Sequence, residues 1–306
     1  MPEISLSVNK FKIRNRKGDI YNLSSCGTND LIDRMQVFLE RDRSLHEDEG
    51  RGKAIGLHKI IQKKGVQREG RDFYKYIYFS LKYGDFGTNA TITNTRTGHV
   101  DFEQQPFHAN TRIYHVMFAI PYGNDITYGL IIFENIGISG VKTLLMPKLK
   151  EFAKTIDENG SFHADPIAPM EYINRLFAES SIKKLALIKY FEEDHADELC
   201  EKEERIFFHP RFNNLPQILH SMVVNRTLTG TGIGQIDGFE PDDLKIVFNF
   251  HGRDKTIGIN NLDSLGFAEY INENDGLIFD EGKLPTDDSL ETIMLKTLES
   301  YMGLVR

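Results

Sequence analysis

The chain has 306 residues, of which 40% are hydrophobic and 27% charged, and its formal net charge is -8. This apolar content is enough for a buried core, which excludes a disordered polypeptide. No apolar run approaches the roughly 18 residues that cross a bilayer, and no signal peptide pattern opens the chain. The two cysteines, Cys26 and Cys200, form neither a disulfide framework nor a metal-ligand spacing. We therefore expect a cytoplasmic protein.

The charges are unevenly distributed along the chain. Residues 1–75 hold 16 Lys and Arg against 11 Asp and Glu, so this quarter carries +5 and the remainder -13. The densest basic stretch contributes eight cations: Arg51, Lys53, Lys59, Lys63, Lys64, Arg68, Arg71 and Lys75. A basic face on an acidic body is typical of proteins that bind polyanions, although such residues are also common on solvated sheets. Residues 191–204 hold eight acidic residues and one lysine, so they would have to face away from a bound phosphate backbone.

In chain order, the first segment predicts two strands and a helix. Ile4–Ile13 alternates apolar and polar positions, as a half-buried strand does, and a turn leads into a second short strand, Ile20–Leu23. A helix follows over Leu31–Leu39, because apolar residues recur there at spacings near three and four. Thr28-Asn29-Asp30 is expected to cap its N-terminus.

From residue 54 to residue 136 the hydrophobic period changes to two, which predicts strands. The expected strands are Ile55–Gln62, Phe73–Lys82, Ala90–Asn94, His99–Phe102, Arg112–Ile120 and Ile126–Phe133. Tyr74, Tyr76 and Tyr78 fall together on one face of their strand. Glycines separate the strands, so we expect an antiparallel meander, either an open sheet or a partly closed barrel.

The rest of the chain mixes helices and strands. The expected elements are a helix over Val141–Ile156, a linker at Asp165–Pro169, a helix through Phe177, strands Lys184–Tyr190 and Arg205–His209, a helix over Leu215–Val224, a hairpin of Asp243–Asn249 and Lys255–Asn260 extended by Phe267–Ile271, and a last amphipathic helix over Asp287–Leu304. The sequence therefore predicts an α+β fold with two domains. Residues 1–160 form a β-rich N-terminal domain with one or two helices, and residues 161–306 a smaller α+β C-terminal domain ending in the amphipathic helix.

The chain contains no motif of a known catalytic or cofactor site. Phosphate-binding loops, zinc-protease motifs and nucleophile elbows are absent from the sequence, so we expect no catalytic residue, no cofactor and no metal site. His99, Asp101 and His108 could supply metal ligands, but a fourth donor is missing, and exposed polar residues are the simpler interpretation. Asp237 and Asp243 leave a metal-dependent nuclease or nucleotide hydrolase open as an alternative, because such enzymes need two carboxylates at a shared metal.

The basic stretch favours nucleic acid as the ligand. Most of its cations lie on two successive predicted strands and their connection, and Lys59 and Lys63 are four residues apart, which directs both to one face. Phosphate contacts require only positive groups at backbone spacing, and tyrosines beside Lys75 could stack on unpaired bases. No segment has the pattern of a recognition helix, so binding without sequence readout is expected. A protein-recognition module, in which the meander binds a phage or host polypeptide, is the other alternative.

The order of elements resembles that of a known family. The segments that carry the resemblance are Phe11–Leu39, Asp125–Phe133, Asp165–Phe177, Ile182–Ile188 and Leu244–Gly258. Their layout is similar to that of the phage-exclusion protein RexA and related abortive-infection proteins, over most of the chain but without an invariant short motif. The resemblance implies a prokaryotic antiviral-defence protein: a cytoplasmic homodimer that senses DNA rather than RNA, is not an enzyme, and acts with a membrane effector protein.

Overall fold

The computed structural model describes residues 3–25, 30–41, 45–48, 50–137, 139–167, 174, 177–178, 180–190, 202–208, 215–225, 243–250, 253–258, 268–282 and 284–302. Contacts divide the chain into two compact units, the first formed by Met1–Pro166 with Gly266–Arg306 and the second by Ile167–Leu265. The fold is mixed, with helices and a large antiparallel sheet.

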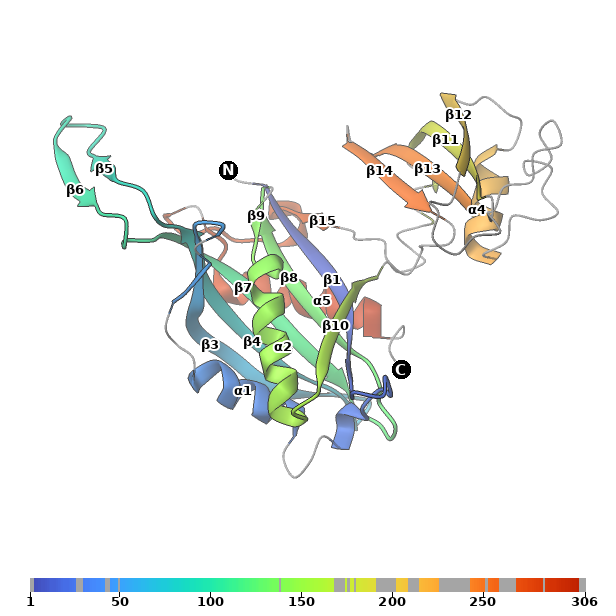
Figure 1. Cartoon of the computed structure of the whole chain (residues 1–306), viewed down its shortest axis with the longest axis horizontal. Helices are drawn as coiled ribbons and strands as arrows, with labels where there is room; N and C mark the ends of the chain where they lie inside the picture. The colour runs from blue at the N-terminus through green and yellow to red at the C-terminus, as the bar shows by residue number, and fades with distance from the viewer. Residues whose placement is uncertain are drawn as a thin grey trace, which may run out of the picture. The chain divides into compact units, whose positions relative to one another are not determined.

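The first unit is built on one antiparallel sheet (Figure 1). Its strand order is β10-β1-β8-β7-β4-β3-β2, with β15 also paired to β1 and β9 to β8. The strands are β1 (Ile4–Arg14), β2 (His46–Asp48), β3 (Lys53–Arg68), β4 (Arg71–Asp85), β7 (Asn110–Pro121), β8 (Gly129–Ile136), β9 (Ser139–Gly140), β10 (Ser161–Pro166) and β15 (Ala268–Ile271). Strands β3, β4, β7 and β8 form the expected meander. The sheet is open, because β10 and β2 at its two ends do not pair, so the alternative of a partly closed barrel is wrong.

Strands β10 and β15 lie on the same edge of β1. Strand β8 pairs with Ile4–Phe11 along one edge, which leaves the other edge to β10, opposite Asn9–Arg14, and to β15, opposite Ile4–Ser7. Both strands run antiparallel to β1, so together they occupy the position of one neighbouring strand. The second unit is the stretch of chain between these two halves.

Helices cover both faces of the sheet. Figure 1 shows α1 (Leu31–Arg41) and α2 (Lys142–Ile156) in front of the sheet and α5 (Asp287–Met302) behind it. The 3-10 helices are η1 (Leu23–Ser25) and η4 (Glu273–Asp275). The N-terminus of α1 is capped as expected, because Asp30 Oδ1 accepts a hydrogen bond from the Ile32 amide at 2.9 Å. Pro147 lies inside α2, as the sequence indicates.

The two faces of β4 are divided as the sequence predicts. The Tyr76 hydroxyl donates to Glu291 Oε1 at 2.7 Å and the Tyr78 hydroxyl to the Asp287 carbonyl at 3.2 Å, so both tyrosines face α5. Ile77 alternates with them and is buried on the opposite face. Strand alternation therefore directs the tyrosine hydroxyls toward α5.

A separate two-stranded ribbon interrupts the meander. It consists of β5 (Ala90–Thr93) and β6 (Val100–Gln104), which pair only with each other among the strands that the structure describes. The ribbon connects the end of β4 to the start of β7, and Figure 1 shows it projecting away from the large sheet. The sequence predicts both strands but not their separation from the meander.

The second unit contains an antiparallel sheet with strand order β12-β11-β13-β14. Its elements are β11 (Ser181–Tyr190), β12 (Lys202–Phe208), α4 (Leu215–Asn225), β13 (Asp243–Phe250) and β14 (Arg253–Gly258). Leu219, Met222 and Val223 of α4 are buried. Most of the predicted helix through Phe177 and most of the acidic stretch 191–204 lie outside the described residues.

Three sequence-based expectations differ from the structure. Phe267–Ile271 does not extend the hairpin of the second unit, because β15 pairs with β1 instead. The final helix likewise packs on the first unit, so a division at residue 160 separates α5 from the sheet that it covers. Ile20 forms only an isolated bridge to Arg14 rather than a strand. The first two differences arise because the hydrophobic period and the composition do not reveal that the chain returns to the first unit after the second unit.

Candidate functional site

The predicted cations gather on one long hairpin. Strands β3 and β4 pair from Lys53 opposite Asp85 to Arg68 opposite Arg71. Glu69 and Gly70 connect them with positive φ angles of 53° and 75°, as a two-residue type I′ turn requires. The hairpin therefore carries all of the predicted cations except Arg51, which precedes β3.

Five cations lie in the distal half of the hairpin, which we call the hairpin tip. They are Lys63, Lys64, Arg68, Arg71 and Lys75. Lys63 Nζ lies 2.8 Å from Asp33 Oδ1, and Lys75 pairs with Asp30; both carboxylates belong to the N-terminal region of α1. The Arg68 guanidinium lies over the Phe73 ring, 5.6 Å from its centroid. Within the described part of the chain, no carboxylate forms an ion pair with Lys64 or Arg71.

A surface hollow lies between the tip and the start of α1. It is lined by Asp30, Ile32, Asp33, Lys63, Lys64, Gly65 and Lys75. The hydrogen bond to Asp30 raises the pKa of Lys75 against the opposing effect of burial, so the side chain stays cationic at neutral pH. The Lys75 ammonium also lies 5.0 Å from the centroid of the Tyr122 ring. Lys63 and Lys75 therefore bring two positive groups beside the start of α1, whereas Lys64, opposite Tyr76, lies on the face of the sheet that α5 covers.

The remaining predicted cations lie elsewhere. Arg51 pairs with Asp48 at 3.3 Å, and Lys53 pairs with Asp85 near the opposite end of the hairpin. Lys59 Nζ lies 2.5 Å from Asp287 Oδ2, at the start of α5. The eight cations are thus divided among the tip, the base of the hairpin and the α5 side of the sheet.

The expectation that Lys59 and Lys63 share a face is wrong. Lys59 is opposite Ser80 and Lys63 is opposite Ile77, two residues of β4 that point to different faces. The register shifts between Leu57 and Lys59 and again between Ile60 and Gln62. Such bulges displace the alternation of side chains along a strand. The period of two therefore fails for the middle of β3.

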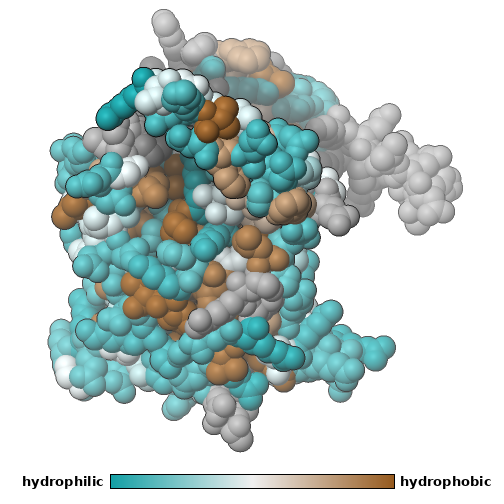
Figure 2. All heavy atoms as spheres, turned by 90° about the vertical axis from the view of Figure 1, so that its left-hand side faces the viewer, coloured by the Kyte–Doolittle hydropathy of each residue, from teal (hydrophilic) through white to brown (hydrophobic). Residues whose placement is uncertain are grey.

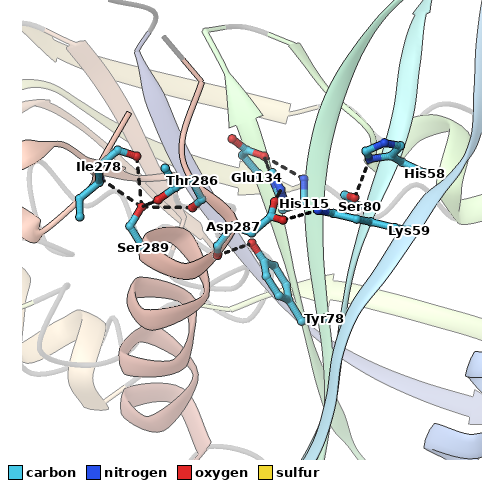
Figure 3. A network of polar contacts seen from close by, with 10 residues as sticks. All are labelled: His58, Lys59, Tyr78, Ser80, His115, Glu134, Ile278, Thr286, Asp287 and Ser289. Carbon is cyan, nitrogen blue, oxygen red and sulfur yellow. Dashed lines mark hydrogen bonds and ion pairs between the residues drawn. The ribbon is translucent and has the colours of Figure 1, made fainter. Parts of the chain in front are cut away.

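A network of polar contacts links the other face of the sheet to α5 (Figure 3). The His115 ring on β7 lies 2.7 Å through Nδ1 from Glu134 Oε2 of β8 and 2.9 Å through Nε2 from Asp287 Oδ1. The His115 amide also donates to Glu134 Oε2, at 2.8 Å. His115 is 3% exposed and Glu134 is fully buried, so these contacts lie within the core. Lys59, through its pair with Asp287, extends the network to the surface.

The charges in this network alternate. Burial would lower the pKa of His115, but the hydrogen bonds and negative charges of Glu134 and Asp287 outweigh it and raise the pKa. Burial would raise the pKa of Asp287, whereas the hydrogen bonds and positive charges of Lys59 and His115 lower it. His115 therefore lies between two carboxyl groups that favour its protonated form, and the second of them, Asp287, is also paired with the Lys59 ammonium.

This network fastens α5 to the sheet and is not arranged for catalysis. Both ring nitrogens of His115 face carboxylates, so neither is available to activate a hydroxyl group. The Ser289 hydroxyl accepts from the Ile278 amide at 3.1 Å and holds the segment before the helix (Figure 3). Sequence reasoning missed the network because Asp287 lies 172 residues from His115. A usable signal was present: His115 and Glu134 are ionisable residues flanked by the apolar stretches of their strands.

The carboxylates considered for a nuclease do not form a site in the described residues. Asp237 lies outside them, and Asp243 is 3% exposed with Oδ1 accepting from the Leu244 amide at 2.8 Å. The described part of the chain contains no group of three or more His, Cys, Asp or Glu side chains that could hold a metal ion, the trio His99, Asp101 and His108 included. None of its helices is both long and apolar enough to cross a membrane.

Comparison with models of known protein families and with curated protein sequences finds no match for this chain.

Proposed function

We propose that this protein binds nucleic acid through the hairpin tip, by contacts to the phosphate backbone that do not read base sequence. The observation that carries the proposal is the gathering of Lys63, Lys64, Arg68, Arg71 and Lys75 on one two-stranded hairpin. Strand β4 is paired with β7 from Tyr74 to Asp85, so these cations lie at the end of a wider sheet, where they can contact the phosphate backbone from its surface. Following the family resemblance, we assign it the role of a cytoplasmic DNA sensor in abortive infection.

The carboxylates at the tip do not prevent such binding. The side chains of Lys63 and Asp33 are 39% and 55% exposed, and exposed ion pairs contribute at most about 1 kcal/mol. A phosphate can therefore displace Asp33 at small cost, and Asp30 sits in a comparable, somewhat less exposed pair with Lys75. Lys64 and Arg71 form no ion pair within the described part of the chain, so a phosphate would displace no carboxylate from them there.

Salt dependence gives a quantitative test. If three to five phosphates are neutralised, raising the salt from about 50 to about 200 mM should weaken binding roughly 40- to 500-fold. The measurement is fluorescence anisotropy of labelled duplex DNA, with single-stranded DNA and duplex RNA as comparisons. Binding that is absent at low salt, or that does not weaken with salt, would contradict the proposal.

A pair of matched variants locates the interface. The variant Lys64→Glu with Arg71→Glu reverses two charges at the tip, and Arg51→Glu with Lys53→Glu makes the same change in net charge at the base. We expect the tip variant to lose at least about tenfold in affinity and the base variant to stay close to wild type. Equal losses in both would show that net charge alone, and not the tip, governs binding. Phage plating on cells that carry the tip variant tests the defence role separately.

A further inference from the structure

The end of β1 and the turn after it carry a second group of cations, which we call the β1 basic run. Residues 10–17 read Lys-Phe-Lys-Ile-Arg-Asn-Arg-Lys, with five cations and no carboxylate. Phe11 and Ile13 are fully buried and fix this part of the strand in the sheet. Because side chains alternate along a strand, the other three positions of the strand lie together on the opposite face: Lys10, Lys12 and Arg14. The remaining two cations, Arg16 and Lys17, are exposed in the turn.

The β1 basic run and the hairpin tip lie at the same end of the sheet. Pairing is antiparallel from β1 to β8, from β8 to β7 and from β7 to β4, so β1 runs opposite to β4. The Arg14 end of β1 is therefore at the same end of the sheet as the Arg71 end of β4. Figure 1 shows β1, β8, β7 and β4 next to one another in this order.

One cation from each group also lies on the same face. Cross-strand neighbours form a single row across five strands: Lys64, Tyr76, Ala119, Leu130 and Lys10. Neighbours in such a row share a face, and Tyr76 faces α5, so Lys64 and Lys10 both lie on the α5 face. Four strand spacings of about 4.8 Å, roughly 19 Å in all, separate these two lysines.

The cations of the run have little negative charge beside them. The Lys10 and Lys12 ammonium groups both lie over the Tyr128 ring, 4.5 and 5.7 Å from its centroid. Lys12 is 3.9 Å from Asp165, whose side chain is 57% exposed, and such exposed pairs contribute at most about 1 kcal/mol. The run forms no other ion pair with the residues that the structure describes. Two ammonium groups at one ring therefore share a single, weakly held carboxylate.

The neighbouring strand β10 responds to this positive charge. His163 is the cross-strand partner of Lys12. Burial lowers the pKa of His163, and the charges of Arg14 and Lys12 lower it further, against the opposing effect of Asp165. A surface on which positive charge exceeds negative charge attracts phosphate groups.

We propose that the β1 basic run is a second contact surface for the phosphate backbone of the nucleic acid that the hairpin tip binds. The inference rests on the function proposed above. A separation of roughly 19 Å corresponds to five or six base pairs, at ~3.4 Å of helix axis per pair. Tyr76, Ala119 and Leu130 are buried, so the contacts fall at two separate places. The ligand is therefore a duplex of at least about six base pairs, and a single nucleotide is too short to reach both.

The base of the hairpin provides a comparison surface. Figure 2 views the molecule from the side of β3 and the β5–β6 ribbon and shows hydrophobic residues interspersed among the hydrophilic ones. Arg51 and Lys53 at this base are each paired with a carboxylate. Arg51→Gln with Lys53→Gln therefore removes two charges that are already neutralised, whereas Lys10→Gln with Lys12→Gln removes two that share one carboxylate.

The salt dependence of binding to a labelled duplex of about 20 base pairs, two helical turns, tests the proposal. Each phosphate contact contributes about 0.9 to the slope of log K against log salt, so Lys10→Gln with Lys12→Gln should lower the slope by about 1.8. Between ~50 and ~200 mM salt, wild type should then lose roughly 12-fold more affinity than this variant. The base control should keep the wild-type slope. Arg16→Gln with Lys17→Gln repeats the test in the exposed turn without altering a strand.

Lysine acylation locates the contacts, since the duplex should protect Lys10, Lys12 and Lys64. Unchanged slopes in both variants of the run, with the tip variant still impaired, would overturn this inference and leave the tip as the binding site. No binding by wild type at low salt would overturn the proposed function as well. An equal change of slope in the base control would attribute the effect to net charge and also overturn the inference. So would equal protection of Lys10 and Lys12 by inorganic phosphate, because the ligand of the run would then be a free anion.

Discussion

Replacing His115 with leucine is the most direct test of the network that fastens α5. The substitution removes the imidazole ring and leaves the Glu134 side chain fully buried, with the amide of residue 115 as its only hydrogen-bond partner among the described residues. Within the same part of the chain Glu134 Oε1 has no hydrogen-bond partner, so the carboxyl group depends on its contact with His115. We therefore expect His115→Leu to destabilise the first unit strongly.

The expected magnitude follows from the burial of both groups. Removing one partner of a buried ion pair costs about 3–5 kcal/mol, because the other charge is left uncompensated in the core. This is a large part of the ~5–15 kcal/mol by which a typical domain is stable. Replacing both partners with apolar residues is often neutral. The double variant His115→Leu with Glu134→Leu should therefore recover most of the stability that the single variant loses.

Urea unfolding followed by circular dichroism measures the total effect, and hydrogen exchange over residues 287–302 reports on α5 itself. His99→Leu is a suitable control, because His99 is exposed on the ribbon and its replacement should change stability by less than about 0.5 kcal/mol. A loss below about 1 kcal/mol for His115→Leu, or a double variant as unstable as the single one, would refute the interpretation of a buried charged pair.

The structure leads to three further expectations. The pKa of His115 is raised in the folded protein, so the stability that its protonation contributes is fully present below the ordinary pKa of 6.5. This contribution is lost as the pH rises through the raised pKa. The urea unfolding midpoint should fall over this pH range in wild type and not in His115→Leu. The pKa of Asp287 is lowered in the folded protein, so the stability that its ionised form contributes is present above the ordinary pKa of 3.8. This contribution is lost as the pH falls through the lowered pKa. Asp287→Asn should remove this part of the decrease in stability at acid pH. Gly84→Ala should destabilise the sheet by about 3 kcal/mol or more, because the new Cβ would lie 1.8 Å from the Asn110 carbonyl oxygen. Gly50→Ala is the control, because its new Cβ would have its nearest neighbour at 3.5 Å and should be tolerated. Thermal unfolding of both variants measures the difference.

Local periodicity was sufficient to find most of the strands and helices. The alternation in β4 correctly predicts the common face of Tyr76 and Tyr78, because a regular strand preserves the period of two. The same reasoning failed in β3, where bulges shift the register and separate Lys59 from Lys63. A bulge is set by pairing with the neighbouring strand and leaves little trace in composition.

The long-range features could not be predicted in this way. The concentration of cations on the hairpin is visible in the sequence, but their pairing with Asp30, Asp33 and Asp287 depends on how α1 and α5 pack on the sheet. The same packing brings His115 and Asp287 together. Charge counts give the number of cations in a segment, whereas only the fold shows which of them are already neutralised.

The split edge of β1 has a consequence for synthesis on the ribosome. Ile4–Ser7 are made before the second unit, but the strand that covers their outer edge, β15, follows only after the entire second unit has been made. Until then this part of β1 presents unpaired amides and carbonyls, which can template incorrect pairing with other chains. Nascent chains of this protein therefore depend on the segment that contains β15 for a finished sheet, and products that end before it are expected to aggregate rather than fold.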